Sequence, residues 1–132
     1  DLARRDLSER GIALTVDVPP AEAALDGDLV SQVLYALVLN AGESEQAAQV
    51  ALTGRVDVGS LVFEVADDGV GVAPEARGRL FEPFFTTKAQ GTGLGLAMAE
   101  KVAQAHGGRL ELVDGGLGPG GRGARFRLTV PT

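Results

Sequence analysis

The feature that most constrains this chain is a pair of glycine-rich turns that bracket a segment of aromatic, hydroxyl and cationic residues. The first turn reads D-D-G-V-G at residues 67–71, and the second reads G-T-G-L-G-L at residues 91–96. Glycine has no Cβ, so it permits sharp turns and close approach of the backbone to a ligand. A helix-like sequence follows the second turn, and the N–H groups at a helix N-terminus favour an anion such as a phosphate.

Neither turn identifies a ligand by itself, because short glycine motifs are also common in ordinary tight turns. Neither turn has the dinucleotide-binding form G-x-G-x-x-G, and the second lacks the G-K-[ST] ending of a P-loop. On their own residues, both turns therefore remain open to a structural or a ligand-binding interpretation.

The composition is typical of one globular domain, with 132 residues, of which 45% are hydrophobic and 23% charged. The net charge of −6 argues against nucleic acid as a partner, because nucleic-acid-binding domains usually carry a basic patch. No apolar run reaches the roughly 20 residues that span a bilayer, and we expect no direct membrane contact. The chain has no cysteine, which fits a reducing compartment. We expect a cytoplasmic domain, whose parent protein can be anchored in a membrane.

Hydrophobic periodicity predicts strands that alternate with helices. Strands are predicted at residues 12–18, 49–54, 60–67 and 124–130 and from residue 110, with a short one near 23–25; helices are predicted at residues 29–41, 76–81 and 94–106. This order predicts an α/β fold of two layers, with one mixed sheet covered by about three helices. In the last helix we expect an inner stripe of Leu94, Met98, Val102 and Ala105.

Asp67 has an unusual position in the strand predicted at residues 60–67. Side chains alternate between the two faces of a strand, and Asp67 shares its parity with the apolar set at positions 61, 63 and 65. The carboxylate should therefore face the core, while Asp68 faces away. A buried carboxylate is costly unless it is hydrogen-bonded. Asp67 either caps the turn at Gly69 or binds a ligand.

Two further polar residues are candidates for chemistry. Asn40 lies near the end of the helix predicted at residues 29–41, on a face apart from its apolar stripe. This predicted stripe consists of Val30, Val33, Leu34, Leu37, Val38 and Ala41. His106 is the sole histidine and precedes Gly107 and Gly108 at the end of the last helix. We interpret His106 as structural and not as a phosphoacceptor.

Taken together and in order, these stretches resemble the nucleotide-binding signature of sensor histidine kinases, within the GHKL ATPase superfamily. The resemblance consists of an N box around Asn40, the two glycine boxes, and an F box at residues 81–85 between them. The tail fits too, with A-H-G-G at residues 105–108 and G-x-G-A-x-F at residues 121–126. The similarity covers nearly all of the chain from Gly11 onward.

The resemblance implies the Bergerat fold, a two-layer α/β sandwich with a mixed five-stranded main sheet. Residues 1–10 would be the end of a linker helix from a dimerisation domain, and residues 11–132 the ATP-binding catalytic domain. Such a domain binds Mg·ATP and donates the γ-phosphate to a histidine on the separate dimerisation domain of the same parent. The parent would act in turn on a response regulator.

The resemblance also implies roles for individual residues. Asn40 would supply an oxygen to Mg²⁺, Asp67 would accept a hydrogen bond from the adenine amino group, and Lys88 would meet phosphate. Residues 84–91 would form a lid that the F box docks, and the Phe-Phe-Thr-Thr-Lys form resembles one subclass of orthodox kinases. The implied catalytic residues are Asn40 and Lys88, and the implied nucleotide-binding residues are Asn40, Asp67, Gly69, Gly71, Phe84, Thr86, Thr87, Lys88, Gly91, Thr92, Gly93, Leu94 and Gly95.

Ala36 departs from the family pattern. Sensor kinases usually have a second Asn at this position, and GHKL enzymes that hydrolyse ATP have a Glu there to activate water. We therefore expect slow hydrolysis and a weaker metal site. Two alternatives remain: a serine kinase of the anti-sigma type, and a degenerate nucleotide-binding module.

Overall fold

The computed structural model describes residues 7–9, 11–17, 27–42, 47–82 and 95–131. Within these ranges the strands are β1 (Ala13–Asp17), β2 (Gln49–Asp57), β3 (Ser60–Asp67), β4 (Arg109–Val113) and β5 (Arg125–Pro131). The long helices are α2 (Gly27–Gly42) and α3 (Gly95–Ala105), and two short 3₁₀ helices are η2 (Pro74–Ala76) and η3 (Pro119–Gly121). None of the helices in these ranges is long and apolar enough to cross a membrane.

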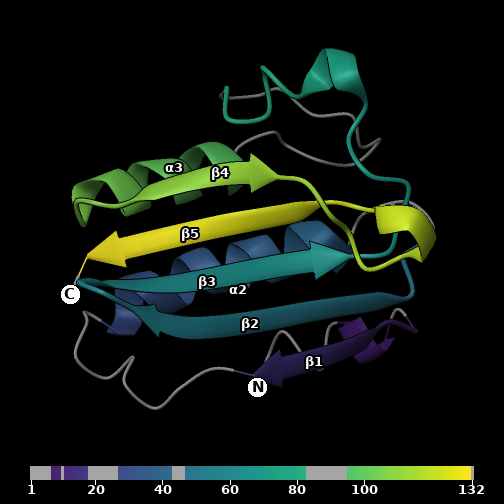
Figure 1. Ribbon diagram of the computed structural model, residues 1–132, viewed down its shortest axis with the longest axis horizontal. Coiled ribbons are helices and arrows are strands. Elements are labelled where there is room, and N and C mark those ends of the chain that lie inside the picture. Colours follow the sequence, from purple (N-terminus) through teal and green to yellow (C-terminus); the bar gives the residue numbers. More distant parts are fainter. Residues whose placement is uncertain (1–6, 10, 18–26, 43–46, 83–94, 132) are drawn as a thin grey trace.

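The strands form one five-stranded sheet in the order β1-β2-β3-β5-β4 (Figure 1). β1 and β2 are parallel, and the other neighbouring pairs are antiparallel. The predicted mixed five-stranded sheet is therefore confirmed. β3 lies at its centre between β2 and β5, so its carboxyl end is enclosed by neighbouring strands.

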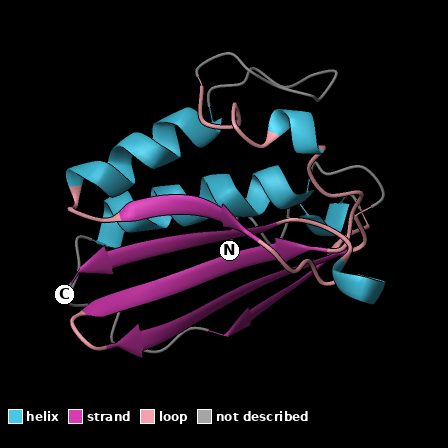
Figure 2. Cartoon of the chain, turned by 45° about the horizontal axis from the view of Figure 1, so that its top comes forward, coloured by secondary structure: helices cyan, strands magenta, loops and turns pink. Residues whose placement is uncertain are grey.

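Both long helices cover the same face of this sheet (Figure 2). α2 packs on β2 and β3, α3 packs on β4 and β5, and the two helices also contact each other. The core lies between the layers, and it is formed by alternate residues of the strands and one face of each helix. The predicted two-layer α/β sandwich is confirmed.

The apolar stripe predicted for α2 is also confirmed among its described side chains. Val33, Leu37, Val38 and Ala41 are at most 3% exposed. They recur at the spacing that places side chains on one face of a helix. This face holds α2 against the sheet and so fixes the position of its polar residues.

The stripe predicted for α3 is wrong at two positions, whereas Val102 packs partly buried against the core as predicted. Met98 is 62% exposed and Ala105 is exposed, whereas Ala97, Ala99 and Ala103 are buried. The reason is that α3 packs against α2 and against the sheet at once. Small side chains allow this close approach, and the larger Met98 is placed outside. Leu94 lies outside the described residues.

Three local differences from the sequence prediction have simple causes. β2 extends to Asp57 because it pairs with β3 along its whole length, as far as the pair Asp57 and Ser60. The helix predicted at residues 76–81 is the 3₁₀ turn η2 followed by further turns, because its hydrogen bonds span three residues and not four. The short strand predicted near residues 23–25 lies outside the described part of the chain.

Leu7 anchors the segment before the first strand. It is 0% exposed, and the N–H of Ile12 donates to its carbonyl at 2.8 Å. A Cβ added at Gly42 would lie 2.0 Å from Leu7 Cδ2, so a larger residue at the end of α2 would displace the Leu7 side chain. Gly11, with a φ of +75°, ends the helical turn as the sequence predicts.

Candidate functional site

The site is centred on Asp67, the last residue of β3. Its side chain faces the core as its parity predicts, and the residue is 2% exposed. Oδ1 accepts hydrogen bonds from the backbone N–H of Gly69 at 2.9 Å and of Ala124 at 3.4 Å. The Asp67 N–H donates to the carbonyl of Ala124, and the Asp67 carbonyl accepts from the Leu117 N–H, both at 2.9 Å. Asp67 is thus held by the turn that follows it and by a loop from the other end of the chain.

Glycines make the close contact between these two segments possible. Gly123 has a φ of +112°, and a Cβ there would lie 1.9 Å from the carbonyl oxygen of Asp67. Gly71 has a φ of +82°, and its Cβ would lie 3.2 Å from the carbonyl oxygen of Gly123. Any larger residue at Gly123 would therefore push the loop of residues 115–123 away from the Asp67 turn.

The side chain of Asp68 points away from that of Asp67 and accepts hydrogen bonds at the start of the neighbouring strand β2. Its Oδ1 accepts the N–H groups of Ala48 at 2.8 Å and of Gln49 at 3.0 Å. The hydrogen bonds from Gln49 and Ala48 lower the pKa of the Asp68 carboxyl. Asp68 thereby ties the start of β2 to the turn after β3, a role that the sequence pattern did not reveal.

Asn40 lies in the last turn of α2, one turn after Ala36, and both are half-buried. α2 runs in the same direction as β3 (Figure 1), so its C-terminal end lies on the side of the sheet where β3 ends. Only residues 43–48 separate α2 from the start of β2, which is hydrogen-bonded to Asp68. The fold therefore places Asn40 and Asp67 at the same end of the sheet, where β3 finishes.

The F box begins on the core side of β5. Phe81 is half-buried, and its ring meets the ring of Phe126 edge to face, with centroids 6.2 Å apart and an interplanar angle of 80°. This contact fixes the start of the segment that leads to the second glycine run. The second run does lead into a helix, because α3 begins at Gly95. The predicted site residues Phe84, Thr86, Thr87, Lys88, Gly91, Thr92, Gly93 and Leu94 lie outside the described residues.

His106 has the surroundings of a helix-end residue. Its Nδ1 lies 2.9 Å from the carbonyl oxygen of Val102, one turn earlier. Gly107 has a φ of +76°, and the N–H of Gly108 bonds to the carbonyl of Ala103 at 2.9 Å. This is the glycine C-cap that the sequence predicts.

The same helix end is remote from Asp67. A Cβ at Gly108 would lie 2.0 Å from the carbonyl oxygen of Thr129, which is near the end of β5. Ala124, the partner of Asp67, lies at the opposite end of that strand. The geometry therefore supports the structural interpretation of His106.

A hollow of about 400 Å³ opens beside the site, lined in part by Val72, Leu112, Gly123 and Ala124. Asp67 is not among its lining residues. The glycines that line this hollow all come from the loop of residues 115–123.

This fold and site define a class of nucleotide-binding domain. A mixed sheet is covered by helices on one face, and a buried aspartate at the end of its central strand opens a glycine turn. Phe81 contacts Phe126 of the core, and the sequence continues from it to a second glycine run before α3. Comparison with known proteins narrows the class further.

Residues 25–132 match the family model described as Histidine kinase-, DNA gyrase B-, and HSP90-like ATPase. The chain is 44% identical to nitrogen regulation protein NtrY of Azorhizobium caulinodans over 86% of its own length and 16% of NtrY. It is 34% identical to sensor histidine kinase ZraS of Escherichia coli K12 over 98% of its length and 28% of ZraS. Full-length ShkA in complex with AMPPNP superposes with a TM-score of 0.79 at 36% identity, over 98% of this chain and 27% of ShkA.

The chain belongs to this ATPase family, as the ATP-binding catalytic domain of a two-component sensor histidine kinase. It spans less than a third of the length of either curated relative. The predicted family and domain type are thereby confirmed.

Proposed function

We propose that this domain binds Mg·ATP with the adenine at Asp67 and donates the γ-phosphate to a histidine on a separate dimerisation domain. The observation that carries the proposal is the burial of Asp67 at the end of the central strand. The backbone N–H groups of Gly69 and Ala124 hold Oδ1 of this carboxylate in place, and an ionised carboxylate only accepts hydrogen bonds. An adenine amino group is a neutral donor of matching chemistry. The similar protein ShkA is known in complex with AMPPNP, which supports a nucleotide as the ligand of this domain.

Asn40 is the residue that we propose as the protein ligand of Mg²⁺. Its side-chain amide offers the kind of oxygen that Mg²⁺ prefers, and its half-buried position at the helix end suits a ligand shared with phosphate. No group of three or more His, Cys, Asp or Glu side chains that could hold a metal occurs in the described ranges. The residues present therefore fit an ion that is bound mainly through phosphate oxygens and water. When bound, Mg²⁺ would neutralise phosphate charge.

The work of this domain in phosphoryl transfer would be positioning and charge neutralisation. A nitrogen of the acceptor histidine attacks the γ-phosphorus, the bond from that phosphorus to the bridging oxygen breaks, and ADP leaves. Lys88 and the other proposed phosphate-binding residues between Phe84 and Gly95 would hold the transferred group. Ala36 provides neither a second metal ligand nor a base for water, which favours transfer to a partner over hydrolysis.

The partners follow from the same proposal. The histidine would come from a dimerisation domain of the same parent, with residues 1–10 as the end of the connecting helix. The response regulator would be reached through the parent. The relative ZraS, which is named as a sensor histidine kinase, favours this assignment over the serine-kinase alternative.

The proposal predicts that Asp67→Asn loses ATP binding while the domain stays folded. The variant replaces an acceptor-only group with one that also presents an NH₂, so it loses a charge-assisted hydrogen bond worth roughly 1.5–3 kcal/mol, which is about 10- to 150-fold in affinity. Calorimetric titration of ATP with and without Mg²⁺ measures this.

Asp68→Asn is the matched control, because the same change is made at the neighbouring residue, which faces β2. It should lower stability and leave ATP affinity near wild type. Near wild-type affinity in a folded Asp67→Asn protein would remove Asp67 from the site.

A further inference from the structure

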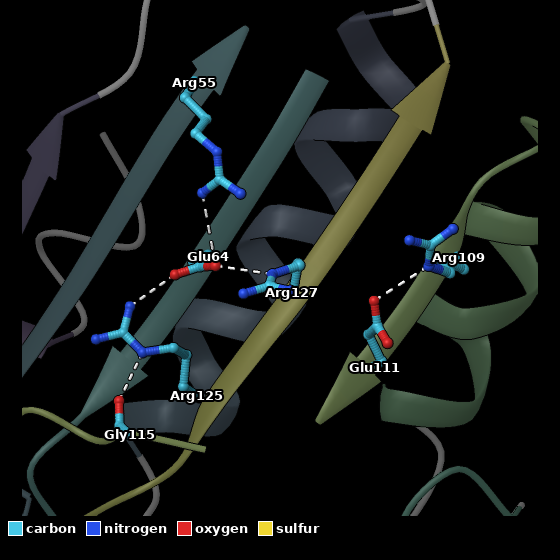
Figure 3. A network of polar contacts seen from close by, with 7 residues as sticks. All are labelled: Arg55, Glu64, Arg109, Glu111, Gly115, Arg125 and Arg127. Atoms are coloured by element: carbon cyan, nitrogen blue, oxygen red, sulfur yellow. Dashed lines mark hydrogen bonds and ion pairs between the residues drawn. The ribbon is translucent and has the colours of Figure 1, made fainter. Parts of the chain in front are cut away.

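A cluster of charged side chains surrounds Glu64 on the face of the sheet that points away from the helices (Figure 3). Glu64 alternates with the core-facing residues of β3, yet it is only 9% exposed. Arg55 from β2 and Arg125 and Arg127 from β5 lie against it. We call these four residues the Glu64 cluster.

Each carboxylate oxygen of Glu64 has its own arginine. Arg125 Nη1 donates to Oε1 at 2.7 Å and Arg127 Nε donates to Oε2 at 2.8 Å, while Arg55 lies 3.7 Å from Oε2. Burial acts to raise the pKa of Glu64, but the hydrogen bonds and charges of Arg127 and Arg125 outweigh it and lower the pKa. Glu64 is therefore ionised at neutral pH and fixes the orientation of both guanidinium groups.

Arg125 differs from the other two arginines because it makes a second contact outside the cluster. Its Nε donates to the carbonyl oxygen of Gly115 at 2.6 Å (Figure 3). A guanidinium is a rigid fork of donors, so one group can hold a carboxylate and a carbonyl together. Arg125 thereby ties the first residue of the loop 115–123 to the centre of the sheet.

This loop is the one that holds Asp67. Two residues after Gly115, the N–H of Leu117 donates to the Asp67 carbonyl at 2.9 Å. At the other end of the loop, Gly123 packs so closely that a Cβ would lie 1.9 Å from the same oxygen. A movement of Gly115 would therefore be passed to Asp67 through a short stretch of backbone.

We propose that Glu64 and Arg125 are positioning residues of the nucleotide site. Glu64 orients Arg125, and Arg125 holds the loop 115–123 against Asp67, which sets the selectivity for adenine. This inference rests on the proposed function, in which Asp67 accepts a hydrogen bond from the adenine amino group. Because the two residues act through Asp67, they should affect recognition of the base and leave the binding of phosphate unchanged.

The test is a calorimetric titration of Mg·ATP and of Mg·GTP into the 132-residue chain and its Arg125→Met variant. GTP has a carbonyl where adenine has its amino group. It therefore cannot donate a hydrogen bond to Asp67 from that position. We expect ATP affinity to fall about tenfold, a fraction of the effect of losing a hydrogen bond to a charged group. GTP affinity should stay unchanged, so the ratio of ATP affinity to GTP affinity should fall about tenfold.

Arg109→Met is the matched control on the same sheet face. Arg109 pairs with Glu111 at 3.1 Å, and its side chain is 70% exposed (Figure 3). Its removal should leave the ATP-to-GTP ratio at the wild-type value. Arg125→Lys covers the case in which Arg125→Met does not fold, because lysine keeps a charge beside Glu64 but lacks the fork. Arg125→Lys should also lower the ratio of ATP affinity to GTP affinity. Glu64→Gln should lower the same ratio.

Asp67→Asn in the same series distinguishes a failure of the proposed adenine site from a failure of the positioning role of Glu64 and Arg125. If Asp67→Asn binds ATP like the wild type, the proposed site fails, and the inference fails with it. If Asp67→Asn loses ATP binding while the Arg125 variants keep the wild-type ratio, only the inference is overturned. Lower thermal stability of the Arg125 variants with an unchanged ratio would also overturn it, since it would show a structural role alone.

Discussion

Glu64 and Asp67 show how one strand places two carboxylates in different chemical surroundings. Glu64 lies on the outer face and is held by arginine side chains, whereas Asp67 lies on the inner face and is held by backbone N–H groups. Both are nearly buried. Buried carboxylates require such partners, because an unpaired charge in a low-dielectric environment is costly.

Glu64 leads to a prediction about stability and pH. Its pKa is lowered from an ordinary value of 4.5 in the folded chain, where burial opposes the shift and Arg127 and Arg125 cause it. Its contribution should therefore be fully present above the unfolded-state pKa and lost as the pH falls through the folded-state pKa. The contribution should be about 1–2 kcal/mol, because the arginines are partly exposed and solvent screens them.

Urea denaturation from neutral pH downward measures this effect. Glu64→Gln should be less stable than the wild type at neutral pH, and the difference should shrink as the solution becomes acid. A difference that is constant over the whole range would show that the ionisation of Glu64 does not stabilise the fold.

Side-chain direction was predictable for single residues, but long-range partners were not. Alternation along β3 predicts that Asp67 faces the core and Asp68 faces away. The N–H groups of Leu117 and Ala124 come from at least 50 residues further along the chain, and no local pattern points to them. The arginines around Glu64 are similarly brought together only by strand order and register.

At the level of elements, the loop of residues 115–123 gives a second prediction about the site. Gly123 and Gly120 both have positive φ, but they differ in the space around them. A Cβ at Gly123 would collide with the Asp67 carbonyl, whereas a Cβ at Gly120 would meet nothing within 4 Å. Gly123→Ala should therefore displace the loop from Asp67 and weaken ATP binding by about tenfold or more, the effect of one lost charge-assisted hydrogen bond.

Gly120→Ala is the control for backbone strain, since a left-handed conformation costs a non-glycine residue about 1–2 kcal/mol in either variant. It should lose some stability in urea and keep its ATP affinity. Equal ATP affinities for the two folded alanine variants would show that contact between Gly123 and Asp67 does not shape the site.

The bounds of a helix or strand were predicted well where its hydrophobic period is ended by a residue that favours a turn. β3 has the predicted bounds, and α3 differs by one residue at each end. The inner face of α3 could not be predicted from residue size, because its alanines are selected by contact with both α2 and the sheet. The turns after η2 resemble a helix in composition, but their hydrogen bonds are of the 3₁₀ kind.

At the level of the whole molecule, the layers determine which groups can meet. Asp67 is held at one end of the sheet. The C-terminal ends of α2 and β3 lie at this end, as does the start of β5. His106 lies beside the far end of β5, bonded to its own helix. This division supports a domain that binds the nucleotide and passes its phosphate to a histidine elsewhere.

The most direct test uses ATP labelled at the γ-phosphate, first with this chain alone and then with the histidine-bearing dimerisation domain of its parent. Alone, the chain should bind Mg·ATP, acquire no acid-labile label and hydrolyse ATP slowly, because a missing general base typically costs a factor of roughly 10²–10⁴. After addition of the dimerisation domain, acid-labile label should accumulate on that domain. Acid-labile label on the isolated chain that disappears in His106→Ala would contradict the account.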